Sequence, residues 1–390
     1  MRRLTLLLAG LAALSCSGSP RHESMAELRG RVIERARVQT VYMDSLLNER
    51  QAPGTDWQGP RTFQDGKLLT TGVSGWVSGF YPGVLWQVYE ATEDTLFWSL
   101  ATKYTKPLAA LLVRDTDHDI GFQLMSSYGR WLDSGTADAN TAEALREVLR
   151  EGAGTLAGRF DPEIGVIRSW NGDHWNYPVI IDNMMNLELL MKYGDRAIAE
   201  KHALTTAANH FREDGTTWHL VNYADDGSVL GKQTVQGYAD DSAWARGQSW
   251  ALYGYAMMAR EERAAGNEEL AGTFYGIADK LKGWLLAHLP EDGIPCWDYS
   301  QTDYRDASAG AILASGLLIL NELKPDETAL QTADRILRTL ASPEYLADPR
   351  TNGGFLLKHS VGNLPGGSEI DVPLTYADYY FLEALSRFPR

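Results

Sequence analysis

The stretch ASAGAILASGLLILNEL, from Ala307 to Leu323, combines small residues with large apolar ones and contains no charged residue before Glu322. Apolar and small residues recur in it at the i, i+3 and i+4 spacing of a packed helix, as at Ile312, Leu313, Gly316 and Leu317. A second stretch repeats this spacing at Leu187, Leu190 and Met191. Packed helices are therefore the expected building unit of the fold.

Working outward from these stretches, helical patterns recur along the chain. A long amphipathic helix is expected over residues 25–49. Further helices are expected to begin near Gly79, Thr95, Gly121, Thr141, Asp182, Asp195, Ser242, Asn267, Ala307, Glu327 and Pro373. No alternation of strands and helices appears, which argues against Rossmann and TIM architectures. We predict an all-α fold of about twelve helices, arranged as an (α/α)6 barrel. An open helical-repeat solenoid is the alternative, but no sequence repeat of fixed period supports it.

Long connections rich in Gly, Asp, Trp and Pro separate some of these helices. They are Phe160–Tyr177, Glu213–Tyr238, Pro290–Arg305 and Thr351–Asp371, and a few carry short β-prone pieces such as residues 217–223. We expect these loops to gather on one active face of the barrel. No Pro- or Ser-rich linker divides the chain, so residues 21–390 are predicted to form a single domain.

The charge of the chain limits its partners. Among 390 residues, 51 are Asp or Glu and 36 are Lys or Arg, for a net charge of −15. This balance argues against nucleic acid and against an anionic membrane surface, because both require a basic face. An acidic sugar remains compatible if a local cationic pocket receives it. We expect a monomer or a weak dimer.

The N-terminus has the features of a targeting segment. Arg2 and Arg3 precede a short apolar run over residues 4–14, which is too short to span a bilayer. The sequence ALSC that ends at Cys16 is similar to a bacterial lipobox, in which the cysteine becomes the lipidated first residue. Residues 1–20 are thus predicted to be a signal peptide of lipoprotein type, with an ordinary cleaved signal as the alternative. The protein is expected in the periplasm or at the outer membrane, with a lipid on Cys16 as its only membrane contact.

The first candidate for chemistry is the acidic stretch DTDHDIGF over residues 115–122. Its alternating Asp residues suggest a calcium loop, but Ile120 stands where such a loop needs Gly, and Ser126 stands where it needs Glu. We therefore do not predict a calcium loop in this stretch. Asp119 directly precedes a helix, so helix capping is the alternative to a catalytic role.

The second candidate is Asp182, which lies between an apolar run and a helix. It follows a loop that carries Trp170, His174 and Trp175. A carboxyl group at such a boundary has its protonated form favoured by desolvation, as a general acid near neutral pH requires. A helix cap is again the alternative.

The third candidate is a group of residues spaced four apart, Ser242, Arg246 and Trp250. This spacing places them on one face of a helix. A guanidinium can hold a sugar carboxylate while an indole covers the sugar ring, so the group is typical of an acidic-sugar site. The alternative is an interior helix in which Asp240 or Asp241 forms a salt bridge with Arg246.

Five motifs occur in one order along the chain: WVSGFYPG (76–83), HDIGF (118–122), IDNMMNL (181–187), QGYADDSAWARGQ (236–248) and DYYFLEAL (378–385). Together they resemble the unsaturated glucuronyl hydrolases of glycoside hydrolase family 88, and the resemblance runs from about residue 30 to the end. It implies an (α/α)6 barrel without a metal ion or another cofactor. It also implies removal of an unsaturated uronic acid from lyase-made oligosaccharides, by hydration of the C4=C5 bond.

The resemblance also implies roles for particular residues. Asp182 corresponds to the acid/base of the family, and Asp119 to a second essential carboxylate that tunes it. The implied substrate-binding positions are Trp76, His118, Trp170, His219, Gln236, Arg246 and Trp250. The loop with His359, Gly362 and Asn363 departs from the family pattern, which leaves open its choice of neighbouring sugar.

The resemblance makes a glycosaminoglycan fragment the expected substrate. Unsaturated rhamnogalacturonyl or ulvan-oligosaccharide hydrolases, with the same chemistry, are the closest alternative. The rhamnogalacturonyl relatives normally lack an Asp equivalent to Asp119, so this residue favours the glucuronyl branch. An inverting glycosidase acting on saturated glycosides and a non-catalytic glycan-binding lipoprotein are further alternatives.

Overall fold

The computed structural model describes residues 23–50 and 56–389. The predicted signal peptide and Cys16 lie outside these residues, so export and lipid attachment stay predictions. In the part of the chain that is described, no helix is both long enough and apolar enough to cross a membrane.

Helices dominate the architecture. The α-helices are α1 Met25–Arg50, α2 Phe80–Thr92, α3 Thr95–Thr105, α4 Ile120–Leu124, α5 Arg130–Asp133, α6 Ala139–Ala157, α7 Leu187–Tyr193, α8 Arg196–His210, α9 Ala245–Ala264, α10 Glu268–His288, α11 Ala307–Leu323, α12 Glu327–Leu340 and α13 Thr375–Arg387. Short 3₁₀ helices are η1 Lys106–Val113, η3 Ile181–Asn186 and η4 Asn352–Gly354, and the π-helical turn η2 Met125–Gly129 joins α4 to α5.

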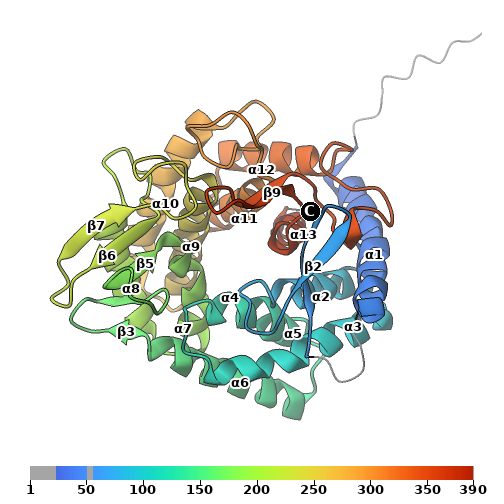
Figure 1. Cartoon of the computed structure of the whole chain (residues 1–390), viewed down its shortest axis with the longest axis horizontal. Coiled ribbons are helices and arrows are strands. Elements are labelled where there is room, and N and C mark those ends of the chain that lie inside the picture. Colours follow the sequence, from blue (N-terminus) through green and yellow to red (C-terminus); the bar gives the residue numbers. More distant parts are fainter. Residues whose placement is uncertain (1–22, 51–55, 390) are drawn as a thin grey trace, which may run out of the picture.

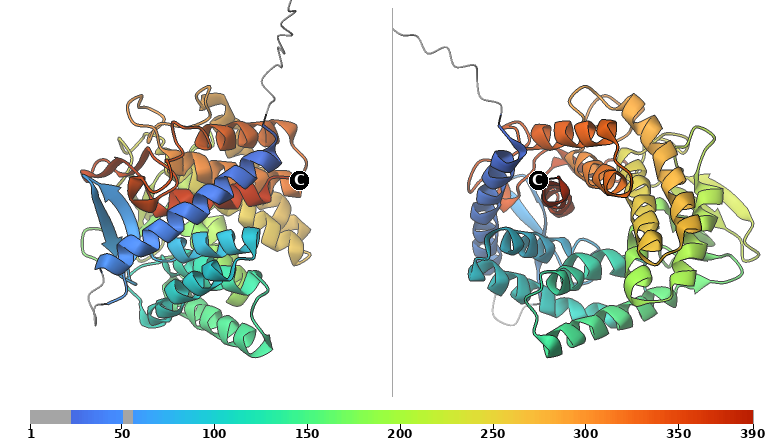
Figure 2. Two further views of the ribbon diagram at one scale, coloured as in Figure 1. Left: turned by 90° about the vertical axis from the view of Figure 1, so that its right-hand side faces the viewer. Right: turned by 180° about the vertical axis from the view of Figure 1, so that it is seen from behind.

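These helices form two concentric rings (Figures 1 and 2). The inner ring consists of α2, the continuous α4–η2–α5 unit, α7, α9, α11 and α13. Neighbouring inner helices contact one another, and α13 packs against α2 to close the ring. The outer ring consists of α1, α3, α6, α8, α10 and α12. Counting α4–η2–α5 as one, the described residues form twelve helical units that alternate between the rings.

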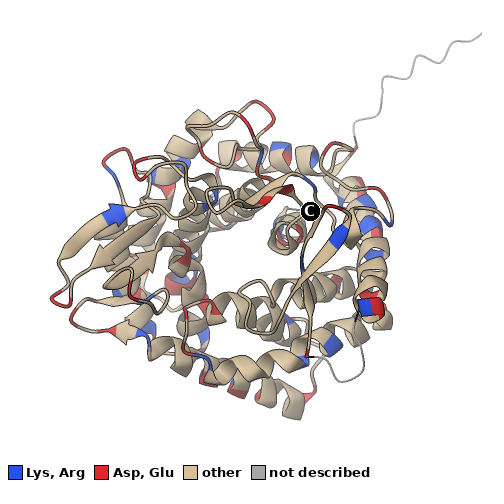
Figure 3. Ribbon diagram, in the orientation of Figure 1, with Lys and Arg blue, Asp and Glu red and all other residues tan. Residues whose placement is uncertain are grey.

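The apolar patterns explain which ring a helix joins. Every residue of α11 from Ala307 to Leu320 is buried, as expected for a helix that is apolar on all sides. Its outer neighbour α12 buries one stripe, which includes Ala329, Ala333 and Ile336, and keeps charged residues on the other face. Acidic and basic residues are spread along outer helices such as α1 and α6 (Figure 3).

Short antiparallel strands stiffen the loops to a greater extent than the sequence predicted. They are β1 Gly59–Gln64 with β2 Lys67–Thr71, β3 Phe160–Asp161 with β4 Val166–Ile167, β5 Tyr177–Ile180 with β6 Leu220–Tyr223 and β7 Val229–Gln233, and β8 Ser360–Asn363 with β9 Ser368–Val372. Pairing satisfies backbone groups of long loops that fold back over the barrel. The β5–β6 pair joins two loops far apart in sequence, which local composition does not reveal, and the other pairs are hairpins within one loop.

One predicted helix start is wrong, and the error affects a candidate site. Helix α9 begins at Ala245, because Trp244 has an extended backbone and bridges to Asp298. Ser242 therefore lies in the preceding turn, where its hydroxyl donates to Asp298 Oδ2 at 2.6 Å. It does not share a helix face with Arg246 and Trp250.

Candidate active site

The structure places the two predicted carboxylates on adjacent elements of the inner ring. Asp119 is the residue before α4, and Asp182 is the second residue of η3. The side chain of Asp119 makes no capping hydrogen bond, and Asp182 lies inside η3, whose N-cap residue is Ile180. Helix capping, the alternative reading of both residues, is therefore wrong for their side chains.

Close packing of α4 against η3 brings these carboxylates together. A Cβ on Gly121 would lie 2.5 Å from Asn186 Cα, so only glycine allows this approach without a shift. Asn186 Oδ1 accepts a hydrogen bond from Phe122 N at 2.8 Å, and Asn183 Nδ2 donates to Ile167 O at 2.8 Å. Asn186 thus fastens η3 to the helix that follows Asp119, and Asn183 fastens η3 to β4.

The surroundings raise the pKa of both carboxyl groups to near neutral pH. Burial raises the pKa of Asp182 to about 7, against the opposing effects of Arg246 and the Trp250 indole. Burial also raises the pKa of Asp119 to about 7, where Arg114 opposes the shift and the charge of Asp182 adds to it. At neutral pH each group can therefore be either protonated or charged, and the charge on Asp182 disfavours a charge on Asp119.

His219 faces Asp182 in a defined tautomer. Its Nδ1 accepts hydrogen bonds from the backbone N–H groups of Val235 at 3.1 Å and Gln236 at 3.3 Å. Burial lowers the pKa of His219 to about 3, so the ring is neutral and its proton resides on Nε2. Nε2 lies 3.6 Å from Asp182 Oδ2, and neither atom has a hydrogen-bond partner among the described residues.

His118 stands in a similar relation to Asp119. Its Nε2 lies 3.5 Å from Asp119 Oδ1, and the side chain is 2% exposed. Burial, together with the charges of Arg159 and Arg114, lowers the pKa of His118 to about 3. Each carboxyl group is therefore faced by a neutral imidazole. Such a ring can form a hydrogen bond with the carboxyl group in either its protonated or its charged form.

Arg246 is near the pair, but protein groups surround its guanidinium. Arg246 donates to Val361 O, to Gly362 O at 2.6 Å and to Asp306 Oδ2 at 3.3 Å. Its ion-pair partner is thus Asp306, and the predicted alternative of a salt bridge to Asp240 or Asp241 is wrong. Asp306 lies 60 residues further along the chain, beyond the reach of a local pattern. The role of Arg246 toward a sugar carboxylate stays a prediction.

Aromatic side chains line the same region. The half-buried Trp76 ring lies 4.8 Å from the Tyr376 ring and 5.7 Å from the Phe122 ring. Phe122 in turn lies 5.1 Å from Trp250, which is fully buried. Arg246 extends over Tyr376 at 5.5 Å from its centroid. Phe122, Tyr376 and Trp250 are buried, so Trp76 is the ring of this group that is open enough to cover the apolar face of a sugar.

The remaining predicted binding residues join this cluster through the loops. Gln236 Nε2 donates to Gly362 O at 3.0 Å, the carbonyl that Arg246 also contacts. Trp170 is half-buried and forms a backbone bridge with Asp117, two residues before Asp119. All nine predicted site residues thus belong to one connected region of contacts around the two carboxylates.

Sequence patterns did not identify some residues that hold the site residues in place. Gln248 holds the backbone of Thr217 from both sides, accepting from its N–H at 2.8 Å and donating to its carbonyl at 3.1 Å. Thr217 stands two residues before His219, so this clamp positions the histidine. Tyr376 was also missed. Gln248 ends the QGYADDSAWARGQ motif, but nothing local in the sequence indicates the contacts of either residue, because these contacts join distant parts of the chain.

Known proteins resemble the chain over most of its length, although no family model matches it. An unsaturated glucuronyl hydrolase of Formosa agariphila is 40% identical over 328 residues, which are 80% of this chain and 79% of that protein. An unsaturated chondroitin disaccharide hydrolase of Streptococcus pneumoniae is 30% identical over 357 residues, 85% of this chain and 86% of that protein. The crystal structure of an unsaturated glucuronyl hydrolase specific for heparin superposes with a TM-score of 0.83 at 38% identity, covering 92% of this chain and 96% of that one. The predicted all-α barrel is confirmed.

Proposed function

The chain belongs to the unsaturated glucuronyl hydrolases, and we propose that Asp182 is its proton donor and Asp119 the carboxylate that tunes it. The enzyme is a glycoside hydrolase that releases the unsaturated uronic acid from the non-reducing end of lyase-made oligosaccharides. The observation that supports the assignment is the carboxyl pair itself, in which Asp182 is buried and Asp119 is half-buried. Both carboxyl groups have a pKa of about 7, and one of them faces an unpaired imidazole N–H.

The reaction that we propose is hydration of a vinyl ether. The C4=C5 bond of the substrate is conjugated with the ring oxygen on C5, so protonation at C4 leaves an oxocarbenium ion at C5. Water adds to C5 and loses a proton, which gives a hemiketal. The hemiketal opens to a ketone at C5, and the hemiacetal left at C1 then releases the neighbouring sugar with its hydroxyl. One water is consumed and one glycosidic bond is broken.

Asp182 meets both requirements of this sequence. A carboxyl group with a pKa near 7 is protonated often enough to act as an acid, and its conjugate base can then remove the proton of the attacking water. His219 Nε2–H lies 3.6 Å from Asp182 Oδ2, where it can orient that oxygen or the water. Asp119 in its charged form stabilises the positive charge that develops at C5.

We propose glycosaminoglycan fragments as the substrate class. The relatives point in this direction, since one is named for chondroitin disaccharides and one structure is described as specific for heparin. Arg246, Arg114 and Arg159 all act electrostatically on the carboxylates and supply local positive charge within an acidic protein.

The test is a panel of unsaturated disaccharides from chondroitin, hyaluronan, heparin and ulvan lyase digests. We expect the absorbance of the C=C bond to fall with at least one glycosaminoglycan product, because hydration removes the chromophore. Saturated glycosides serve as the control and should remain intact. Failure to consume every unsaturated disaccharide would contradict the proposed activity, and cleavage of saturated glycosides would indicate displacement at C1 instead.

We also propose, from the sequence of residues 1–20, that the enzyme is exported and lipid-anchored through Cys16. Fractionation of cells that produce the native chain or Cys16→Ala tests this. The native protein should sediment with membranes, and the variant should be soluble in the periplasm. Equal membrane association of both would rule out an anchor on Cys16.

A further inference from the structure

We propose that Arg159 is a positioning residue for this reaction: it locks the turn that carries His118 and Asp119 and places a fixed positive charge behind them. The inference rests on the proposed role of the Asp119–Asp182 pair. Arg159 lies between α6 and β3 and belongs to none of the motifs found in the sequence.

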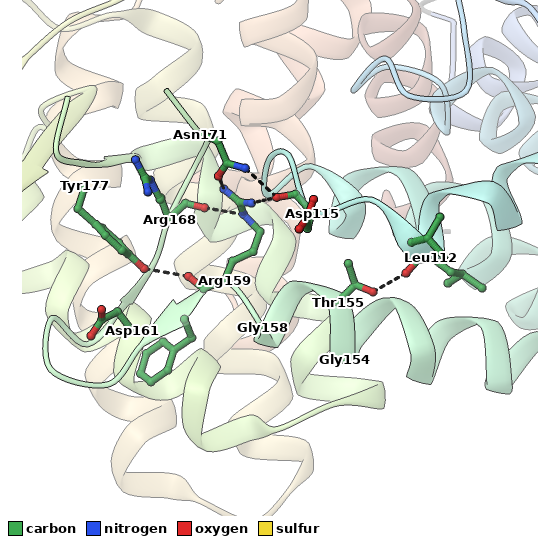
Figure 4. Close-up of a pocket in the computed structure, with 12 residues that line it drawn as sticks. Leu112, Asp115, Gly154, Thr155, Gly158, Arg159, Asp161, Arg168, Asn171 and Tyr177 are labelled. Atoms are coloured by element: carbon green, nitrogen blue, oxygen red, sulfur yellow. Dashed lines mark hydrogen bonds between the residues drawn. The ribbon is translucent and has the colours of Figure 1, made fainter. Parts of the chain in front are cut away.

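Two hydrogen bonds to its carbonyl oxygen hold the backbone of Arg159 in place. Its carbonyl accepts a hydrogen bond from Arg168 N at 3.0 Å, in the β3–β4 hairpin. The Tyr177 hydroxyl donates to the same carbonyl at 2.8 Å (Figure 4). The side chain therefore departs from an anchored point and is 91% shielded from solvent, since the residue is 9% exposed.

The guanidinium joins two segments that are far apart in the chain. Its Nε donates to Arg168 O at 3.0 Å, its Nη1 donates to Asp115 O, and its Nη2 donates to Asn171 Oδ1 at 3.2 Å (Figure 4). Asn171 Nδ2 donates in turn to Asp115 O at 3.2 Å, which closes the connection. The planar fork of an arginine can serve three acceptors at once, as a lysine ammonium cannot in the same geometry.

These two segments are the ones that hold His118. His118 N donates to Ser169 O at 2.9 Å, and Asn171 N donates to Thr116 O at 3.1 Å. The bridge between Asp117 and Trp170 lies between these bonds. Residues 116–118 and 169–171 therefore form a short ladder of backbone hydrogen bonds. Arg159 contacts one end of this ladder, and His118 and Asp119 follow at the other end, so a change in the contacts of Arg159 is expected to shift His118 and Asp119.

The charge of Arg159 acts on the same turn. The charged groups near Asp119 are Arg114 and Arg159, which lower its pKa, Asp182, which raises it, and Asp117, which accepts from Asp119 N at 3.1 Å and pairs with Arg114. The titratable His118 lies 3.5 Å from its carboxylate. Arg159 also lowers the pKa of His118. It therefore favours a charged Asp119 beside a neutral His118.

Arg159 lies at the wall of a pocket, which bears on how it can be substituted. It lines a cavity of about 610 Å³ together with Asp115, Arg168 and Asn171 (Figure 4). A shorter side chain would leave space for water. Arg168 provides a matched control, because it lines the same cavity, donates to Gly172 O at 3.3 Å and points away from Asp115 (Figure 4).

The test compares Arg159→Lys, Arg159→Gln and the control Arg168→Gln in the full chain. In the proposed mechanism Asp119 must be charged. The positive charge of Arg159 lowers the pKa of Asp119, so removing that charge raises this pKa and moves the acid limb of the kcat profile to higher pH. We expect Arg159→Gln to move this limb upward by roughly half a unit, less than the ~1–3 units of a charge in direct contact. Arg159→Lys should keep the limb in place while kcat falls ~10- to 10²-fold through misplacement. Arg168→Gln should keep both.

A direct titration separates this inference from the proposed activity. With ¹³C-labelled Asp carboxyl groups, the Asp119 resonance, assigned by its absence in Asp119→Asn, should titrate at higher pH in Arg159→Gln. This measurement needs no substrate, so it remains decisive even if no disaccharide of the panel is consumed. Unchanged titration in a folded Arg159→Gln variant, or an equal shift in Arg168→Gln, overturns the proposal.

Discussion

Asp182→Asn is expected to abolish turnover, with a fall in kcat of at least ~10²–10⁴-fold, the range for loss of a general acid or base. The amide has nearly the shape of the carboxyl group but neither donates a proton to carbon nor removes one from water. Because Asp182 Oδ2 makes no hydrogen bond to another described residue, the substitution breaks few structural contacts. The loss should therefore be chemical, and KM should change much less than kcat.

Asp378→Asn offers a matched control for this result. Burial raises the pKa of Asp378 to about 7 as well, so the two substitutions remove comparable carboxyl groups. Asp378 accepts hydrogen bonds from Leu356 N and Leu357 N, both at 2.8 Å, and thus has a structural role. Thermal unfolding and kcat should separate the variants. We expect Asp378→Asn to unfold at a lower temperature and keep most of its turnover, and Asp182→Asn to keep its stability and lose its turnover. Substantial turnover by Asp182→Asn would remove this residue from the acid role.

Local sequence patterns predicted the helical scaffold well because helices are local structures. The starts expected near Thr95, Asn267 and Ala307 lie within one residue of those of α3, α10 and α11. In α10, the Asn267 side chain accepts from Leu270 N, so the cap residue itself marks the boundary. The start at Ser242 failed because a contact with Asp298, distant in sequence, holds that residue in a turn.

The site could be predicted only in part for the same physical reason. Asp119 and Asp182 were recognisable from motifs, but a capping residue and an active-site carboxylate look alike in a single sequence. What distinguishes them is burial and the two facing imidazoles, which depend on the packing of α4 against η3. Arg159 lay outside every motif, because its function is to connect segments 44 and 9 residues away through backbone carbonyls.

Asp119→Asn is expected to lower kcat by roughly 10²–10³-fold, as removal of one preorganised electrostatic group at a developing charge does. The amide can still meet His118 Nε2, 3.5 Å from the present carboxylate oxygen, but it cannot carry the negative charge that faces C5 in the transition state. Asp182 remains as the proton donor, so the loss should be smaller than in Asp182→Asn.

The pH dependence identifies this mechanism more sharply than the rate does. In the proposed mechanism the singly protonated pair is the active form, so kcat of the native enzyme should rise and then fall around neutral pH as two macroscopic ionisations occur. The charge of Asp182 raises the pKa of Asp119, and this coupling is reciprocal, so removing Asp119 lowers the pKa of Asp182. Asp119→Asn should therefore lose the acid limb, and its basic limb should move to lower pH.

Asp115→Asn is the control for charge alone, because Asp115 is an exposed carboxylate of the same turn. Its substitution removes one negative charge without touching the pair, and screening by solvent should keep the profile close to that of the native enzyme. If Asp119→Asn kept both limbs, a different group would have to supply the acid limb, and the coupled-pair mechanism would be wrong. If Asp119→Asn loses the acid limb and Asp115→Asn keeps it, the acid limb belongs to Asp119. Asp182 is then the only group of the pair that transfers a proton.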